Sequence, residues 1–294
     1  MAYFLSLLLD GVLAGAIYGL IALAFVVIYK ASRMINFALG EWVMFGSRLT
    51  ATGVHAAGIG LIGALAAAAL AMVALALLFN RVVLRRLVGQ PLIALIMVTL
   101  GLGALMRGAA PVLFAGVPGA IALPIPVAML HLGEVLIAAD KLVTALLAAL
   151  CIGAVAWFFH ASRTGVALRA IADDPQAAMA AGIDVQRHFA LTWAMLGVIS
   201  VIAGTLWTFV SGGGFGLALV GLKVFPIVII GGLDSVPGTI AGAILIGVLE
   251  SLCAGYLDPH LGGGFGGVAS YLVLIAVLFV RPYGLFSRPA AERV

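Results

Sequence analysis

Apolar runs of roughly 20 residues recur along this chain, and they constrain its fold more than any other feature. A helix of about that length crosses the ~30 Å hydrocarbon core of a bilayer. Of the 294 residues, 65% are hydrophobic and only 9% are charged, whereas soluble domains carry about 25% charged residues. The composition therefore excludes a soluble globular core and predicts an all-α, polytopic integral membrane protein.

The apolar segments predict about eight or nine transmembrane or re-entrant helices. Their approximate limits are 6–29, 36–53, 60–80, 91–113, 134–160, 189–210, 219–231, 238–256 and 267–281. Most Lys and Arg residues lie in one set of the intervening loops, and the positive-inside rule assigns that set to the cytoplasm. We therefore expect the N-terminus outside, the C-terminus in the cytoplasm, and an external loop at 114–133.

A face of small residues marks the first predicted span. Gly11, Gly15 and Gly19 lie four residues apart, and this spacing lets another helix approach closely. We expect the first helix to sit inside a bundle, whether it packs against the same chain or against a partner.

Polar residues interrupt the second apolar segment. Asn36, Glu41 and Arg48 lie at or inside this segment, where ionisable groups are costly and usually face a cavity or a partner. Asn36 and Gly40 indicate a broken or late-starting helix, with polar backbone turned inward. A pathway or gating element and a structural polar clamp between helices explain these residues equally well.

Arg107 and Glu250 are two further isolated charges within predicted spans. They could pair with each other. Arg107 could instead extend its long side chain to the membrane interface, because it lies near the end of its span.

Two apolar pieces flank a turn-rich segment at 231–238. Half-helices interrupted by Gly and Pro can place irregular backbone beside a cavity, and a tight cytoplasmic turn explains the segment equally well. Asp234 or Ser235 is expected to cap the helix that begins near Pro237. Gly231, Gly232 and Ser235 are therefore candidates for the lining of a pathway.

The main polar island of the chain runs from Arg163 to His188. Asp173 and Asp174 are good N-cap residues, and Pro175 fits the first helical position. Gly182 fits the position that ends a helix. The island therefore contains a predicted helix of about two turns at 175–181.

A helix this short is marginal in water and needs a partner. Apart from Met179, small alanines such as Ala177 and Ala178 form most of its surface, which suits insertion into a groove on another protein. Arg169 belongs to a second element of the same island. A short connector helix packed on its own bundle is the alternative.

Motifs for chemistry are lacking in this sequence. It contains no His pair at metal-ligand spacing, no Gly-x-Ser-x-Gly elbow and no Walker A motif. We therefore expect no catalytic residue, no metal, no cofactor and no ATP bound by the chain itself.

Five motifs in order resemble the permeases of branched-chain amino acid ABC transporters, and they extend from the second predicted span to the C-terminus. They are Met34-Ile35-Asn36-Phe37-Ala38 with Gly40-Glu41; Thr99-Leu100-Gly101-Leu102; Gly165, Ala167, Leu168, Arg169, Ala170, Ala172, Asp174, Ala177, Gly182 and Ile183; Gly231-Gly232-Leu233 with Ser235 and Pro237-Gly238; and Arg281-Pro282 with Gly284-Leu285-Phe286.

The resemblance implies a single transmembrane permease domain over 1–294 in the bacterial inner membrane, with a cytoplasmic coupling loop at 161–188. It implies three kinds of partner: a second homologous permease, two cytoplasmic ATP-binding subunits and a periplasmic solute-binding protein. The residues implied to couple to the ATPase are Arg169, Asp173, Asp174, Pro175, Ala177, Ala178 and Gly182. The candidates for the translocation pathway are Asn36, Phe37, Gly40, Glu41, Thr99, Gly231, Gly232 and Ser235.

Three positions depart from the family pattern: Leu39 stands where His is frequent, Asp234 where Gly is common, and Tyr283 where a polar residue is frequent. These departures leave the fold untouched and bear on the substrate. Branched-chain or other apolar amino acids are the expected cargo, and urea, short amides or aromatic acids are alternatives on the same scaffold. An autonomous secondary transporter or channel would need a more charged midplane site, and an intramembrane enzyme would need a nucleophile–base pair.

Overall fold

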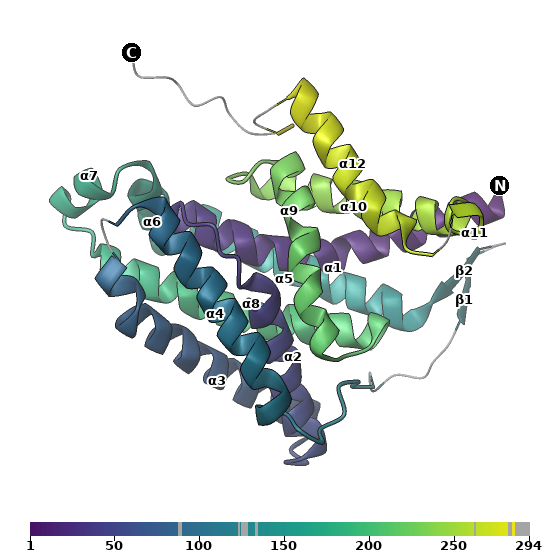
Figure 1. Ribbon diagram of the computed structural model, residues 1–294, viewed down its shortest axis with the longest axis horizontal. Coiled ribbons are helices and arrows are strands. Elements are labelled where there is room, and N and C mark those ends of the chain that lie inside the picture. The colour runs from purple at the N-terminus through teal and green to yellow at the C-terminus, as the bar shows by residue number, and fades with distance from the viewer. Residues whose placement is uncertain are drawn as a thin grey trace. The chain divides into compact units, whose positions relative to one another are not determined.

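The computed structural model describes residues 1–87, 90–122, 124, 129–132, 135–261, 263–281 and 284–285, and these residues are almost entirely helical (Figure 1). They group into two compact units. Unit 1 comprises Met1–Val26, Ile125–Ala149 and Lys223–Val294, and unit 2 comprises Val27–Pro124 and Leu150–Leu222. In the C-terminal motif, Pro282 and Phe286 lie outside the described residues.

The elements follow one another along the chain in this order: α1 (Ala2–Ser32), α2 (Leu39–His55), α3 (Gly60–Val82), η1 (Leu84–Leu87), α4 (Leu92–Leu113), β1 (Met129–Leu132), β2 (Val135–Ala138), α5 (Ala139–Ala161), α6 (Arg163–Asp173), α7 (Pro175–Ala180), α8 (Val185–Ser211), η2 (Phe215–Leu219), α9 (Val220–Gly231), α10 (Val236–Tyr256), α11 (Asp258–Leu261) and α12 (Phe265–Val280).

The membrane fold predicted from the apolar runs is confirmed. Each of the nine predicted segments contains a helix, and six helices in the described part of the chain are long and apolar enough to cross a bilayer. Helices α2, α9 and α12 are shorter, with 17, 12 and 16 residues. The orientation of the termini and the number of crossings stay predictions.

One predicted boundary is wrong. The span expected at 134–160 begins as a helix only at Ala139, because 135–138 form strand β2, which pairs antiparallel with β1. The register places Met129 opposite Ala138. A short apolar run such as 135–138 reads equally well as a strand or as the start of a span, since periodicity cannot separate the two.

Helices α2, α3 and α8 form the packed centre of unit 2. Most of α2 is buried, and the rings of Trp42 and Phe79 lie 5.9 and 5.1 Å from the ring of Trp193 on α8. Polar contacts add to this packing, since Thr205 donates a hydrogen bond of 3.1 Å to Thr50. The centre of unit 2 is therefore close-packed around a helix that carries several polar residues.

In unit 1, the small face of α1 packs against α10. A Cβ on Gly15 would lie 2.9 Å from the carbonyl oxygen of Ala243, and one on Gly11 would meet the backbone of Val248. This confirms the close helix approach predicted from the glycine spacing and assigns it to packing within the chain.

Candidate functional sites

Helix α2 begins late, after a non-helical segment that follows α1. Residues 33–38 adopt no regular helix, and the side-chain oxygen of Asn36 accepts a hydrogen bond of 3.0 Å from the backbone N–H of Ala38. This confirms the late-starting helix predicted from Asn36 and Gly40. We call residues 35–41 the α2 start.

One face of α4 covers the α2 start. Thr99, Gly103 and Arg107 recur every four residues and therefore lie on one side of the helix. The hydroxyl of Thr99 accepts a hydrogen bond of 3.3 Å from the N–H of Phe37 and lies 2.9 Å from the carbonyl of Ile96 on its own helix. Thr99 thus satisfies backbone that the broken helix leaves free.

Arg107, the third residue on this face of α4, forms an ion pair with Glu41. Its Nε donates a hydrogen bond of 3.1 Å to Glu41 Oε1, and its Nη2 donates to the same oxygen. The two ends of the pair differ in burial: the Glu41 side chain is 2% exposed and the Arg107 side chain 61% exposed. The predicted pairing of Arg107 with Glu250 is therefore wrong, and the head of Arg107 is held by the buried Glu41.

The opposite side of the α2 start meets η2 and α9. Gly40 lies so close to the carbonyl oxygen of Ala218 and to the Cα of Gly221 that a Cβ would collide with both. Glu41 lies in the first turn of α2, where the positive end of the helix dipole stabilises a carboxylate. The candidates Asn36, Phe37, Gly40, Glu41 and Thr99 are thus brought together in one polar, irregular site.

The second site is the polar island, which folds as three capped helices within unit 2. Asp174 caps α7, since its Oδ1 accepts hydrogen bonds from the N–H groups of Gln176 at 2.9 Å and Ala177 at 3.0 Å. Gly182 has φ +82°, and the N–H groups of Gly182 and Ile183 bond to the carbonyls of Met179 and Ala178. This is the Schellman ending of a helix, so the predicted start and stop signals are confirmed.

The alanine surface predicted for α7 is only partly correct. Ala177 is exposed, as are Met179 and Ala180, but Ala178 is buried against Ile171 and Val185. The helix therefore uses one alanine to pack on its own chain and presents the others outward.

Arg169 ties the island to the preceding helix. Its Nη1 donates a hydrogen bond of 2.8 Å to the carbonyl of Phe159 near the end of α5. Asp173 is exposed at the end of α6. The predicted coupling residues therefore divide into those that build the element and those that face outward.

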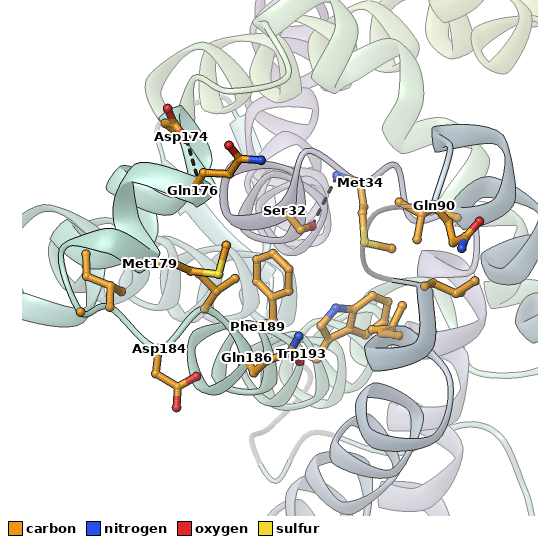
Figure 2. Close-up of a pocket in the computed structure, with 16 residues that line it drawn as sticks. Ser32, Met34, Gln90, Asp174, Gln176, Met179, Asp184, Gln186, Phe189 and Trp193 are labelled. Carbon is orange, nitrogen blue, oxygen red and sulfur yellow. Dashed lines mark hydrogen bonds between the residues drawn. The ribbon is translucent and has the colours of Figure 1, made fainter.

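A cavity of about 790 Å³ lies beside α7. Figure 2 shows Met34, Met179, Phe189 and Trp193 around it, from the non-helical segment after α1, from α7 and from α8. Its lining is mainly apolar. On this side, α7 therefore borders a cavity and is not packed against other side chains.

Comparison with known proteins decides the family. The family described as "Branched-chain amino acid transport system / permease component" matches residues 7–280. The chain belongs to this permease family. It is a transport subunit of the inner membrane, with multiple spans, and it is not an enzyme.

Relatives of this permease align over nearly its whole length. The high-affinity branched-chain amino acid transport system permease protein LivH of Escherichia coli K12 is 28% identical over 99% of this chain and 98% of its own. LivH of Salmonella typhimurium is 27% identical, and BraD of Pseudomonas aeruginosa 28% identical, at the same coverage. No solved structure matches the chain.

The remaining pathway candidates of the permease lie in a tight turn of unit 1. Gly232 has φ +94° and ends α9, and the hydroxyl of Ser235 caps α10 by accepting a hydrogen bond of 3.1 Å from the N–H of Gly238. A Cβ on Gly231 would collide with the backbone of Gly238. Of the two expected caps, Ser235 is correct, and the geometry agrees with the tight turn that was one of the two interpretations of this segment.

A polar cluster that the sequence did not reveal lies in the same unit. Glu250 Oε2 accepts hydrogen bonds of 2.6 Å from the hydroxyl of Tyr18 and 3.1 Å from Lys223 Nζ. Its other oxygen, Oε1, is buried without a partner among the described residues. The isolated charges of Lys223 and Glu250 were the only sign of this cluster in the sequence. A single sequence does not indicate that these two residues, 27 positions apart, form a pair.

Proposed function

We propose that this permease is the membrane subunit of an ATP-driven importer that carries branched-chain or other apolar amino acids across the bacterial inner membrane. ATP hydrolysis would occur in two separate cytoplasmic subunits. A second, homologous permease and a periplasmic solute-binding protein would complete the assembly. Full-length similarity to the branched-chain amino acid permeases LivH and BraD supports this proposal.

The observation that carries the proposal is the build of α7. A six-residue helix is held by an aspartate cap, a glycine stop and one buried alanine, and its other small side chains face outward. Short helices are marginal on their own. The cap at Asp174 and the stop at Gly182 therefore hold α7 so that its outward face can contact a partner. We propose that Ala177 and Met179 seat in a groove of an ATP-binding subunit, within a cytoplasmic coupling loop at 161–188.

We further propose that both units act within one permease domain and that the α2 start lines the translocation pathway. Helix breaks with inward-facing backbone occur where protein lines a cavity. The loop at 114–133 would then face the periplasm.

An autonomous ion-coupled transporter fits the structure less well. Such a protein needs a deep acid that is free to bind the coupling ion. Glu41 is paired with Arg107, and Glu250 with Lys223. Neither deep acid offers an unneutralised site.

The test replaces Ala177 by Trp and compares it with Ala57→Trp, at an exposed alanine between α2 and α3. We expect Ala177→Trp to abolish co-purification of the ATP-binding subunits and uptake, with unchanged permease in the membrane. Ala57→Trp should retain both. If Ala177→Trp keeps ATPase association and uptake, the docking assignment fails.

The cargo is tested with the purified transporter and its binding protein in proteoliposomes. Uptake of leucine, isoleucine and valine is expected to exceed uptake of urea, propionamide and benzoate. A preference for urea, propionamide or benzoate would leave the assignment as an importer intact and would contradict the proposed substrate class.

A further inference from the structure

Arg48 is a buried cation held by the backbone of a loop. It lies on α2 with 3% of its surface exposed. Its Nη2 donates hydrogen bonds of 2.9 Å to the carbonyl of Phe114 and 2.8 Å to the carbonyl of Val117. Both acceptors follow the end of α4. This one guanidinium nitrogen therefore binds the loop after α4 to the middle of α2.

No carboxylate neutralises Arg48 within the described part of the chain. Its Nε is buried without a partner. The rings of Phe114 and Phe215 lie 5.6 and 4.8 Å from the guanidinium carbon, and such cation–π contacts compensate only a small part of a buried charge. Arg107, by contrast, donates two hydrogen bonds to a carboxylate.

The free Nε and the bound Nη2 form one edge of the guanidinium group. This edge matches the two oxygens of a carboxylate, and a bidentate guanidinium–carboxylate pair is among the strong hydrogen-bonded pairs in proteins because both partners are ionised. Two neutral carbonyls on Nη2 leave half of the edge unused. The edge is therefore chemically suited to an anionic, planar, two-oxygen ligand.

A second loop closes over the same group. Gly213 contacts Gly119 so closely that a Cβ on Gly119 would lie 2.8 Å from the carbonyl of Gly213 and 2.9 Å from Arg48 Nη1. Gly212 has φ +76°, a conformation that favours glycine. Phe215, which follows this turn, is 41% exposed, so its ring separates Arg48 from the outside.

These loops lie at the far end of unit 2 from α7. Helix α8 connects the coupling segment to Gly212 with 27 residues, which corresponds to about 40 Å. If α7 faces the cytoplasm, as the proposed function requires, then Arg48 lies at the periplasmic end. This step rests on that proposed function.

We propose that Arg48 binds the α-carboxylate of the arriving amino acid. The carboxylate takes the Nε–Nη2 edge and displaces the carbonyls of Phe114 and Val117. The loop that these carbonyls hold is then released. Arg48 thereby couples arrival of a carboxylate substrate to opening of the periplasmic end.

The experiment uses the assembled transporter in nanodiscs without binding protein and without ATP. Its thermal unfolding is followed with three probes: L-leucine, 4-methylpentanoate, which lacks the ammonium group, and L-leucinamide, which lacks the carboxylate. A ligand that binds the folded state raises the midpoint in proportion to ln(1 + [L]/Kd). The variants are Arg48→Gln and Arg48→Lys, and the control is Arg81→Gln, at an exposed arginine in the last turn of α3.

We expect leucine and 4-methylpentanoate to raise the midpoint of the wild type and of Arg81→Gln, and leucinamide to leave it unchanged. Arg48→Gln should abolish the response. Arg48→Lys, which keeps the charge without the fork, should weaken the apparent affinity about tenfold. If Arg48→Gln does not fold, the weakened affinity of Arg48→Lys still tests the role of Arg48 in binding the carboxylate.

Three outcomes would overturn the proposal. Leucinamide could act as strongly as leucine, or Arg48→Lys could respond like the wild type. The midpoint of the wild type could also stay unchanged with all three probes. Because neither ATP nor ATPase docking is measured, these outcomes are distinct from failure of the importer assignment, which Ala177→Trp tests.

Discussion

Removing Arg107 should destabilise the permease more than neutralising Glu41, although both changes break the same ion pair. In Arg107→Ala, the carboxylate of Glu41, whose side chain is 2% exposed in the wild type, loses its partner. Breaking a buried pair in this way costs about 3–5 kcal/mol. In Glu41→Gln, the amide oxygen still accepts a hydrogen bond from Arg107, whose side chain is 61% exposed and so less dependent on the pair than the buried acid. That change should cost only about 1 kcal/mol, the net value of a hydrogen bond.

Unfolding of the purified chain by SDS in mixed micelles measures this asymmetry. Tryptophan fluorescence provides the signal, and Trp42, the neighbour of Glu41 in the buried part of α2, is one of the four tryptophans that contribute to it. We expect Arg107→Ala to lower the free energy of unfolding by about 3 kcal/mol, and Glu41→Gln with Arg107→Ala to recover about 2 kcal/mol of that loss. The control Arg81→Ala, at an exposed site, should change stability by less than about 0.5 kcal/mol.

The reasoning is refuted if Arg107→Ala is no less stable than Glu41→Gln. That result would mean that Glu41 finds another partner or water when Arg107 is removed. The double variant tests the ion pair directly, because a coupling energy near zero shows that Glu41 and Arg107 contribute nothing to stability as a pair.

Three further predictions concern single contacts. Asp174→Ala removes the cap of α7 and should cost that helix about 1 kcal/mol, seen as roughly fivefold faster amide exchange over 176–180 with α8 unchanged. Gly40→Ala should lower stability by about 1–3 kcal/mol through overpacking, whereas Gly101→Ala, where a Cβ meets open space, should be neutral or slightly stabilising; equal effects would contradict the close approach. Tyr18→Phe should cost about 1 kcal/mol by removing the hydroxyl that donates to Glu250, and the loss should vanish in a Glu250→Ala background, where no acceptor remains at that position.

Local signals predicted local structure well. The caps at Asp174 and Ser235 each involve a donor two or three residues along the chain, and the stop at Gly182 depends on its own φ. Such interactions are contained within the motif itself, so residue type and order were sufficient. The late start of α2 was predictable for the same reason, because Asn36 bonds to backbone two residues away.

The partners of the charged residues were not predictable. Glu41 and Arg107 are 66 residues apart in sequence, and Tyr18 and Glu250 are 232 apart. Tertiary packing decides these contacts, and one sequence carries no signal for them. The burial of Ala178 was missed for a related reason: an all-alanine surface has no polar side to indicate which face turns inward.

The distribution of buried charge favours a substrate that is neutral as a whole and carries a carboxylate. In the Glu41–Arg107 and Glu250–Lys223 pairs, the acid is more buried than the cation, with side-chain exposures of 2% against 61% and 13% against 35%. The long cationic stems can reach outward, so each deep acid is neutralised and repels no carboxylate. Arg48 differs, because among the described residues it is buried without a counter-ion. Under the proposed function, a zwitterionic amino acid would therefore be attracted to Arg48 by its carboxylate and would meet no unpaired carboxylate at Glu41 or Glu250.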